Sequence, residues 1–285
     1  MIKLDNLKSK KTIQELLEFS IINIDKPSGP TSFQVSQYVK DSLGLSKTSH
    51  MGTLDPQVTG VLPITLGRAC KLSDYFMHKN KEYAGIMRLH NGVSKEELEK
   101  IIKKFIGKIT QLPPVRSRVK RAVREREIIS FEILEVEGKE VLFKTEVQAG
   151  TYIRKLCDDI GKQIGGAHML ELRRTKAGIF TENNHNFINL YDFEKAVNEY
   201  KKGNSELLNK ILLPAEEAIK KVLPVIQIEE KNIRQVLTGK PLIKQDIKNI
   251  PIEEKFAAFM KEKFIGIYHS VKEGDLIARA EFVFN

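Results

Sequence analysis

The sequence predicts an α+β protein with one large domain followed by a small β-rich domain. Strand and helix patterns both occur in the first 220 residues, but they do not alternate strictly, as they would in a parallel βαβ fold. Near residues 214–224 two prolines flank a short helical pattern, and short strand patterns follow. We therefore expect an N-terminal extension over residues 1–19, a large domain over residues 20–222 and a small domain over residues 223–285.

The elements of the large domain follow from hydrophobic periodicity and from the positions of capping and turn residues. Thr31 or Ser32 can cap a helix that ends near Gly44, and Ser94 can cap a second helix with an apolar stripe. Two β-rich runs joined by Gly138 predict a hairpin. In chain order we expect helix 12–19, strand 21–25, helix 31–43, loop 46–60, strand 61–67, strand 82–90, helix 94–107, a hairpin within 127–147, helix 151–165 and helix 215–222.

The small domain shows a strand pattern, a helical pattern and then three further strand patterns. These are expected at residues 225–228, 230–240, 255–260, 263–269 and 276–283. The arrangement indicates a small domain built mainly on a β-sheet.

The charge of the chain favours a polyanionic partner. The 47 basic and 37 acidic residues give a net charge of +10. Residues 116–126 hold six basic residues and one acid, and the sequence LRRTK at residues 172–176 forms a second cluster. Such clusters repel themselves unless an anion lies between them, so nucleic acid is the favoured partner. The alternative is a charged face that only contacts water.

Several classes of protein and site are excluded or disfavoured by the sequence. No apolar run approaches the roughly 20 residues of a membrane span, and the N-terminus lacks the apolar core of a secretory signal, so no membrane partner is expected. The two cysteines are expected to stay reduced in the cytoplasm. The sequence has no P-loop, no dinucleotide fingerprint after a strand and no metal-ligand spacing, so we expect no metal and no cofactor.

One carboxylate, Asp55, stands in the loop SHMGTLDPQVTGVLP, residues 49–63. Pro56 disfavours helical geometry at Asp55, and Gly52 and Gly60 allow a tight turn or a close approach. A carboxylate fixed in this way can act as a nucleophile if a cation such as Arg154 keeps it ionised. Pattern alone favours the plainer interpretation, which is that Asp55 is a turn residue.

Six motifs change that balance. They span about residues 20–192 and read, in order, INIDKPSGPTS, HMGTLDPQVTGVLP, KEYAGIMRLH, PPVRSRVKRAVRERE, AGTYIRKLCDDIG and GAHMLELRRTKAG. With these motifs in this order the chain resembles the TruB family of RNA pseudouridine synthases, and within it the archaeal and eukaryotic branch, the dyskerin-type enzyme of box H/ACA ribonucleoproteins. The resemblance implies a mixed-sheet catalytic fold with its active site in a central cleft.

The resemblance also implies roles for individual residues. It makes Asp55 the nucleophile, Tyr83 the tyrosine that stacks on the target base and takes its C5 proton, and Arg154 the partner of Asp55. Substrate RNA is expected to meet the motif residues and the two basic clusters. These RNA-binding candidates are Lys26, His50, Tyr152, Arg116, Arg118, Lys120, Arg121, Arg124, Arg173 and Arg174. An RNA base must leave its stack to react, and an aromatic face can hold it.

Two features depart from the family pattern. Ser49 replaces a glycine, and Met51 is bulkier than the usual residue, which is expected to narrow the pocket entrance. The C-terminal region resembles a PUA domain through EEKNIRQVLTGKPL and EGDLIARAEFVF, and that resemblance implies RNA binding.

The partner requirement can be predicted from the length of one loop. The bacterial branch of the family acts alone on the T-loop uridine of tRNA and carries an insertion after the VK of its PPxxSxxK motif. Here SRVKRAVREREIISFEI runs directly into a strand pattern. This favours an archaeal enzyme that uses a box H/ACA guide RNA and small ribonucleoprotein proteins to modify rRNA. A stand-alone tRNA enzyme and a non-catalytic RNA-binding scaffold are the alternatives.

Overall fold

A computed structural model describes residues 7–113, 122–247 and 254–284. The described chain forms two compact units. The large unit contains residues 22–64 and most of the chain from 73 to 211, and the small unit contains residues 7–21, 65–72 and the described residues from 212 onward. The α+β prediction is confirmed, and so is a β-rich C-terminal region.

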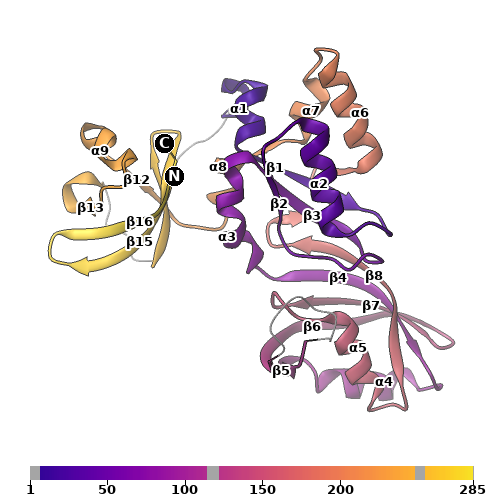
Figure 1. Ribbon diagram of the computed structural model, residues 1–285. Coiled ribbons are helices and arrows are strands. Elements are labelled where there is room, and N and C mark those ends of the chain that lie inside the picture. Colours follow the sequence, from indigo (N-terminus) through magenta and orange to yellow (C-terminus); the bar gives the residue numbers. More distant parts are fainter. Residues whose placement is uncertain (1–6, 114–121, 248–253, 285) are drawn as a thin grey trace. The chain divides into compact units, whose positions relative to one another are not determined.

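A mixed β-sheet forms the large unit, with the strand order β10-β1-β3-β8-β4-β7-β6-β5 (Figure 1). Strand β1 is parallel to β10 and β3 is parallel to β8, whereas β4 is antiparallel to both β8 and β7. The strands are β1 (Ser20–Lys26), β3 (Thr59–Leu66), β4 (Lys81–Leu89), β5 (Gly107–Gln111), β6 (Arg124–Glu137), β7 (Glu140–Val147), β8 (Ala167–Ala177) and β10 (Phe187–Asn189). Short strands β2 (Thr48–His50) and β9 (Phe180–Thr181) pair with β3 and β8.

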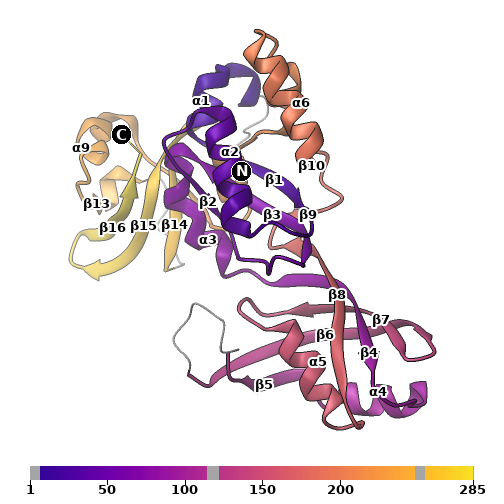
Figure 2. The same cartoon turned by 45° about the vertical axis from the view of Figure 1, so that its right-hand side comes forward.

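Helices α4 (Lys95–Lys103) and α5 (Ile153–Gly161) pack on the strands β4, β6 and β7 (Figure 2). The apolar residues of both helices are buried in one core with residues of these strands, which include Met87, Phe131 and Phe143. Burial of this stripe stabilises each helix because a short helix is marginal in water by itself. The same core therefore fixes the position of α5, which carries Arg154.

Helix α2 (Ser32–Leu43) has the boundaries that its capping residues predict. The Thr31 hydroxyl accepts a hydrogen bond from the Gln34 N–H, and the Gln34 side chain accepts one from the Thr31 N–H. Gly44 ends the helix with φ of +64°. Tyr38 of α2 packs edge-on against Phe193 of α6 (Leu190–Lys201). Helices α3 (Ser73–Met77) and α7 (Glu206–Ile211) complete the large unit.

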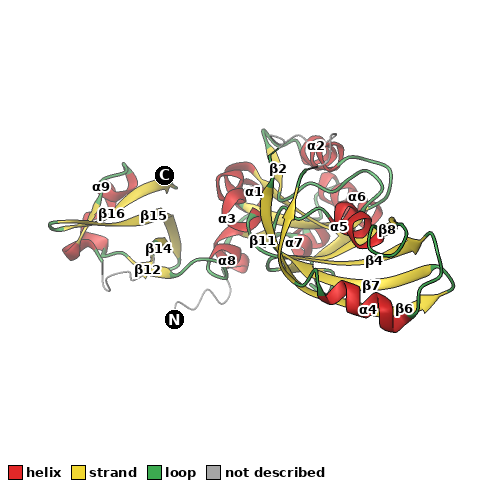
Figure 3. Ribbon diagram, turned by 90° about the horizontal axis from the view of Figure 1, so that it is seen from below, coloured by secondary structure: helices red, strands yellow, loops and turns green. Residues whose placement is uncertain are grey.

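The small unit contains a sheet with the order β12-β14-β15-β16-β13 (Figure 3). Its core contains Phe256 and Tyr268, and Phe19 stacks on Phe264. The strands are β12 (Val225–Gln227), β13 (Leu242–Ile243), β14 (Lys255–Met260), β15 (Lys263–Glu273) and β16 (Leu276–Val283). The other elements are η1 (Lys8–Lys10), α1 (Ile13–Glu18), η2 (Gly67–Leu72), β11 (Leu213–Pro214), α8 (Ala215–Ile219), η3 (Glu230–Asn232), α9 (Ile233–Leu237) and η4 (Lys244–Asp246).

Candidate active site

The loop between β2 and β3 presents Asp55 on a backbone that is held from both sides. The Ser32 hydroxyl, at the start of α2, accepts a hydrogen bond of 2.8 Å from the Leu54 N–H and donates one of 3.1 Å to the Leu54 carbonyl. The Val58 N–H donates to the Asp55 carbonyl at 3.0 Å, which closes a turn around Pro56. Leu54 and Val58 are buried, whereas the Asp55 side chain is 53% exposed. The loop therefore fixes one accessible carboxylate.

Lys26 supports this loop from inside the protein. The residue is fully buried, and its Nζ donates hydrogen bonds to the carbonyls of Pro27, Pro56 and Val58 at 2.8, 2.9 and 2.8 Å. Burial lowers the pKa of Lys26, and the negative charge of Asp55 opposes that change. An ammonium has three donors, and all three are used here. This geometry argues against the expected RNA contact by Lys26 and gives it a role in holding the loop.

Arg154 pairs with Asp55, as the family resemblance implies. It is the second residue of α5, and its Nη2 donates a hydrogen bond to Asp55 Oδ2. Both side chains are about half exposed, at 54% and 53%. An exposed ion pair contributes only about 0–1 kcal/mol to stability. The pair is therefore suited to orienting the exposed carboxylate of Asp55 rather than to stabilising the fold.

Arg174 lies beneath the same loop and is buried, with 1% of its surface exposed. Its Nε donates to the Val61 carbonyl at 2.8 Å and its Nη2 to the Gly52 carbonyl at 2.9 Å. Burial lowers the pKa of Arg174, and its electrostatic interaction with the Tyr83 side chain acts in the opposite direction. The expected RNA contact by Arg174 is not supported, because its donors point at protein groups inside the unit.

Tyr83 and Lys81 lie two residues apart on β4, so their side chains are on the same face of the sheet. They are 8% and 5% exposed. Lys81 Nζ donates to the Met77 carbonyl at 3.0 Å and to the Lys79 carbonyl. Burial, and secondly the charge of Arg174, lower the pKa of Lys81 to about 7. The sequence analysis did not include Lys81, which lies one residue before the strand expected over residues 82–90.

His50 and Met51 begin the loop. The His50 Nε2 lies 3.3 Å from the Thr53 hydroxyl oxygen, and burial followed by the charge of Arg174 lowers the pKa of His50. Met51 is 2% exposed and its N–H donates to the Pro63 carbonyl at 2.9 Å. A side chain this deeply buried does not fit the expectation that Met51 narrows a pocket entrance.

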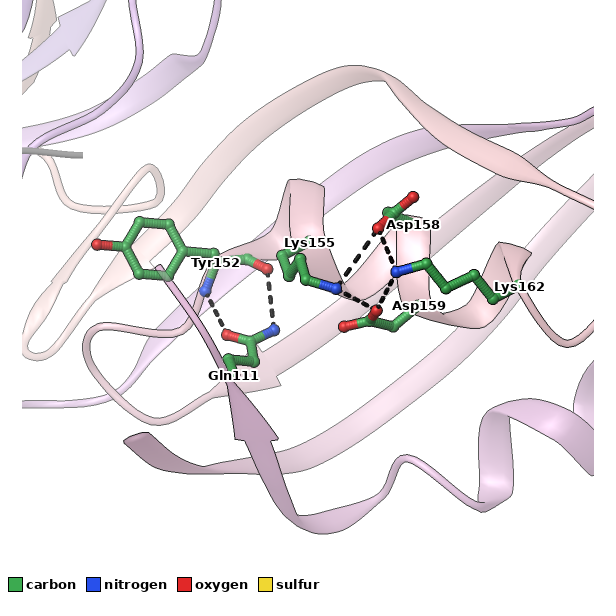
Figure 4. A network of polar contacts seen from close by, with 6 residues as sticks. All are labelled: Gln111, Tyr152, Lys155, Asp158, Asp159 and Lys162. Atoms are coloured by element: carbon green, nitrogen blue, oxygen red, sulfur yellow. Dashed lines mark hydrogen bonds and ion pairs between the residues drawn. The ribbon is translucent and has the colours of Figure 1, made fainter. Parts of the chain in front are cut away.

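Tyr152 is the residue that precedes the first turn of α5 (Figure 4). The carboxamide of Gln111, from β5, makes hydrogen bonds to both backbone groups of Tyr152. Four charged side chains, Lys155, Asp158, Asp159 and Lys162, form an ion-pair network on α5 (Figure 4). Tyr152 therefore starts a helix that is anchored through its backbone.

The two basic clusters have different surroundings. Arg173 forms two hydrogen bonds with Asp25, at 2.9 and 3.1 Å, and one with Glu182 at 2.8 Å. With Arg174 buried, residues 172–176 are not a bare basic surface. Arg124 is half-buried at the start of β6. The remaining candidates of the first cluster, Arg116, Arg118, Lys120 and Arg121, lie outside the described residues.

Within residues 7–113, 122–247 and 254–284, no group of three or more His, Cys, Asp or Glu side chains could hold a metal ion. In the same ranges, the helices are all too short or too polar to cross a membrane.

Two family models match consecutive parts of the chain. Residues 40–153 match the model of the TruB family pseudouridylate synthase N-terminal domain, and residues 154–220 match the tRNA pseudouridylate synthase B C-terminal domain. A probable tRNA pseudouridine synthase B of Methanopyrus kandleri is 47% identical over 232 residues, which cover 81% of this chain and 68% of that protein. One of Nanoarchaeum equitans is 42% identical over 270 residues, with coverages of 94% and 72%.

Solved structures give the same result. A crystal structure of a Cbf5-Nop10-Gar1 complex contains a chain that is 36% identical, with a TM-score of 0.88 and coverage of 98% of this chain and 88% of that one. An H/ACA RNP bound to a substrate RNA containing 2'-deoxyuridine matches with 34% identity, a TM-score of 0.87 and coverages of 98% and 89%. Fold and relatives therefore define the class of the protein, which is a pseudouridine synthase. Within this class the chain belongs to the TruB family.

Proposed function

We propose that the protein converts uridine to pseudouridine in RNA that a box H/ACA guide presents to it, with Asp55 as the nucleophile. One observation carries the assignment of Asp55: its carboxylate is accessible, paired with Arg154, and mounted on a loop whose backbone is fixed on both sides. A nucleophile needs such a fixed position and a partner that favours its charged form. Arg154 and the loop together meet both requirements.

The proposed reaction rearranges one nucleotide and consumes nothing. The bond between C1′ of the ribose and N1 of the uracil breaks, the uracil turns, and a bond forms between C1′ and C5. The proton on C5 leaves and N1 gains one. Asp55 would attack C1′, assist a glycal route or add to C6, and these three routes remain alternatives. We assign removal of the C5 proton to Tyr83, which interacts electrostatically with the buried Arg174.

RNA contacts are proposed for residues with accessible groups near the loop. His50 at the start of the loop would meet the flipped nucleotide, and Tyr152 would line the site. The phosphate backbone of the substrate would meet the basic candidates Arg116, Arg118, Lys120, Arg121 and Arg124. Binding of the substrate RNA should therefore weaken as the salt concentration rises. Arg173, already paired with two acids, would contribute less. Lys26 and Arg174 are reassigned to positioning the loop.

Guide dependence is supported by the solved complexes that the chain resembles, namely a Cbf5-Nop10-Gar1 complex and an H/ACA RNP with substrate RNA. Those complexes suggest guide RNA and small ribonucleoprotein proteins as partners. The alternative is stand-alone action on tRNA, which is favoured by the curated names of the archaeal relatives, probable tRNA pseudouridine synthase B. Both activities are compatible with one active site.

The deciding experiment compares two substrates, a guide-matched RNA and a tRNA, each with and without guide RNA and partner proteins. Conversion of the first substrate only in the full mixture supports guided action, whereas conversion of tRNA by the protein alone supports the alternative. Asp55→Asn serves as the control in every mixture and should abolish conversion. Conversion that survives this substitution would show that Asp55 is not the nucleophile.

We also propose that residues 20–222 form the catalytic domain and that residues 223–285 form a PUA-like domain that binds RNA, in a protein of the cytoplasm. A β-sheet in the described part of the C-terminal region supports the second assignment. A variant that lacks residues 223–285 should bind RNA more weakly than the full chain.

A further inference from the structure

The side chain of Gln111 makes an unusual contact with the start of the arginine-bearing helix. Its Nε2 donates to the Tyr152 carbonyl at 3.2 Å, and its Oε1 accepts from the Tyr152 N–H at 3.0 Å (Figure 4). One carboxamide thus pairs with both backbone groups of one residue, as a neighbouring strand would. Gln111 is 2% exposed, so water competes little for these bonds.

Other hydrogen bonds hold the turn before α5, because the Thr151 N–H and hydroxyl donate to the Gln148 carbonyl at 3.2 and 2.8 Å, but they do not reach Tyr152. Tyr152 is the N-cap residue, and it forms no capping hydrogen bond through its side chain. The chain enters the helix through a turn at Gly150, which has φ of +83°. Helix N-termini expose N–H groups that need partners, and Gln111 supplies the partner for the N–H of Tyr152 itself. The apolar core holds α5 along its length, and among the residues that the structure describes the Gln111 side chain joins its entry point to β5.

Arg154 follows Tyr152 by two residues, so a shift of the Tyr152 backbone also moves the guanidinium that pairs with Asp55. The Arg154–Asp55 pair is half exposed and too weak to set the position of the helix by itself. The precision of the pair must therefore come from the elements that carry it. Lys26 and Ser32 hold the Asp55 side, and Gln111 holds the Arg154 side.

We propose that Gln111 is a positioning residue for uridine isomerisation, which holds the Tyr152 backbone so that Arg154 orients the Asp55 carboxylate. This inference rests on the proposed catalytic role of Asp55. Gln111 touches neither RNA nor the reacting atoms in this scheme, so its loss should lower the rate of the chemical step and leave RNA binding intact.

The test uses Gln111→Met, which keeps the length and approximate volume of the side chain but removes both hydrogen bonds. The matched control is Lys162→Met, at the exposed C-cap residue of the same helix, which removes polar contacts by breaking two ion pairs. In the full guided mixture, we expect the single-turnover rate of Gln111→Met to be about 10- to 100-fold lower than that of the wild type, as a misplacement near 1 Å can cause. The affinity for RNA should change by less than about threefold and the control should keep the wild-type rate.

A second variant covers the case in which Gln111→Met folds poorly. In Gln111→Glu, the ionised carboxylate can accept from the Tyr152 N–H but cannot donate to its carbonyl, whereas the protonated carboxyl can do both. The ratio of the variant rate to the wild-type rate should therefore rise as the pH falls. A ratio that does not change with pH, or a normal rate for Gln111→Met, would overturn the proposal.

Two measurements do not depend on activity. Exchange of the Tyr152 amide hydrogen should be at least about tenfold faster in Gln111→Met, because its partner is lost. A crystal structure of this variant should show Arg154 displaced from Asp55, and an undisturbed pair would also overturn the proposal. If the wild type converts no uridine in any mixture, the proposed function fails, while these two measurements still decide whether Gln111 positions Arg154.

Discussion

The Nζ of Lys26 donates a hydrogen bond of 2.9 Å to the carbonyl of Pro56, the residue that follows Asp55. Lys26 ends β1, so this bond joins the loop directly to the central sheet. The same ammonium also binds the Val58 carbonyl at 2.8 Å. A single buried cation thus ties down both ends of the turn that presents the carboxylate.

Replacing Lys26 should therefore damage catalysis without weakening RNA binding. Lys26→Met leaves three carbonyls without their donor, and each unsatisfied buried group costs about 1–3 kcal/mol. We expect a clear loss of thermal stability and a single-turnover rate at least about tenfold lower, because the Asp55 loop loses its support. Filter binding should show nearly unchanged affinity for RNA. A variant that binds RNA poorly but converts it at the normal rate would contradict this assignment.

Unlike the loss of Lys26, the loss of Arg154 should lower the rate strongly while hardly changing the stability. Arg154→Met breaks a half-exposed ion pair, so the free energy of unfolding should change by less than about 1 kcal/mol. The rate should fall about 100-fold or more because Asp55 loses the cation that orients it. Arg154→Lys should recover only part of the rate, since an ammonium lacks the planar guanidinium geometry. Urea unfolding and single-turnover assays on the same preparations test both expectations. A loss of unfolding free energy well above about 1 kcal/mol, or a rate near that of the wild type, would contradict them.

Local signals in the sequence predicted much of this fold. Thr31, Ser94 and Gly44 limit the two helices α2 and α4 because capping depends on neighbours a few residues away. Gly138 turns the hairpin of β6 and β7 with φ of +56°, as predicted. The long strand β8 was not predicted. Its sequence carries adjacent charged residues, and an arginine at position 174 does not look like a core residue.

The candidate active site was predictable only in part, for a related reason. Burial of Arg174 depends on the Val61 carbonyl, which lies 113 positions away in the chain, and no local pattern can show such a contact. The Asp55–Arg154 pair spans 99 positions; the need of the carboxylate for a cation suggested it, and the family resemblance implied it. The buried Lys81 and Gln111 were missed because lysine and glutamine normally lie at the surface.

Lys81 should make stability depend on pH in the alkaline range. Its pKa is about 7 in the folded protein and 10.5 in the reference state, so between these values the unfolded chain holds a proton that the folded protein has lost. The free energy of unfolding therefore rises with pH in this range, by up to about 1.4 kcal/mol per pH unit from this group. Below pH 7 the destabilisation by the buried charge is fully present.

Lys81→Met removes this dependence. As the pH rises from about 7 to about 10, the wild type should gain unfolding free energy relative to this variant. Urea unfolding at several pH values measures the difference, in which the other titrating groups largely cancel. Lys104→Met, which removes one exposed cation after α4, controls for the change in net charge. A difference that stays constant over the whole range would show that Lys81 is not a buried amine of lowered pKa.

Gly60 tests how closely the loop must approach β8. It has φ of +100°, and a Cβ built on it would lie 2.2 Å from the carbonyl oxygen of Arg174. Gly29 has a similar φ of +110°, and a Cβ built on it would have nothing within 4 Å, so it provides a matched control for backbone strain alone.

Gly29→Ala should lower the free energy of unfolding by about 1–2 kcal/mol. Gly60→Ala should cost about 1–3 kcal/mol more, because the strand pairing of β3 with β8 must open to admit the methyl group. It should also slow conversion, since Arg174 supports the Gly52 carbonyl of the loop. Equal losses in the two variants, measured by urea unfolding, would mean that β3 and β8 can separate without cost and that the loop does not depend on this contact.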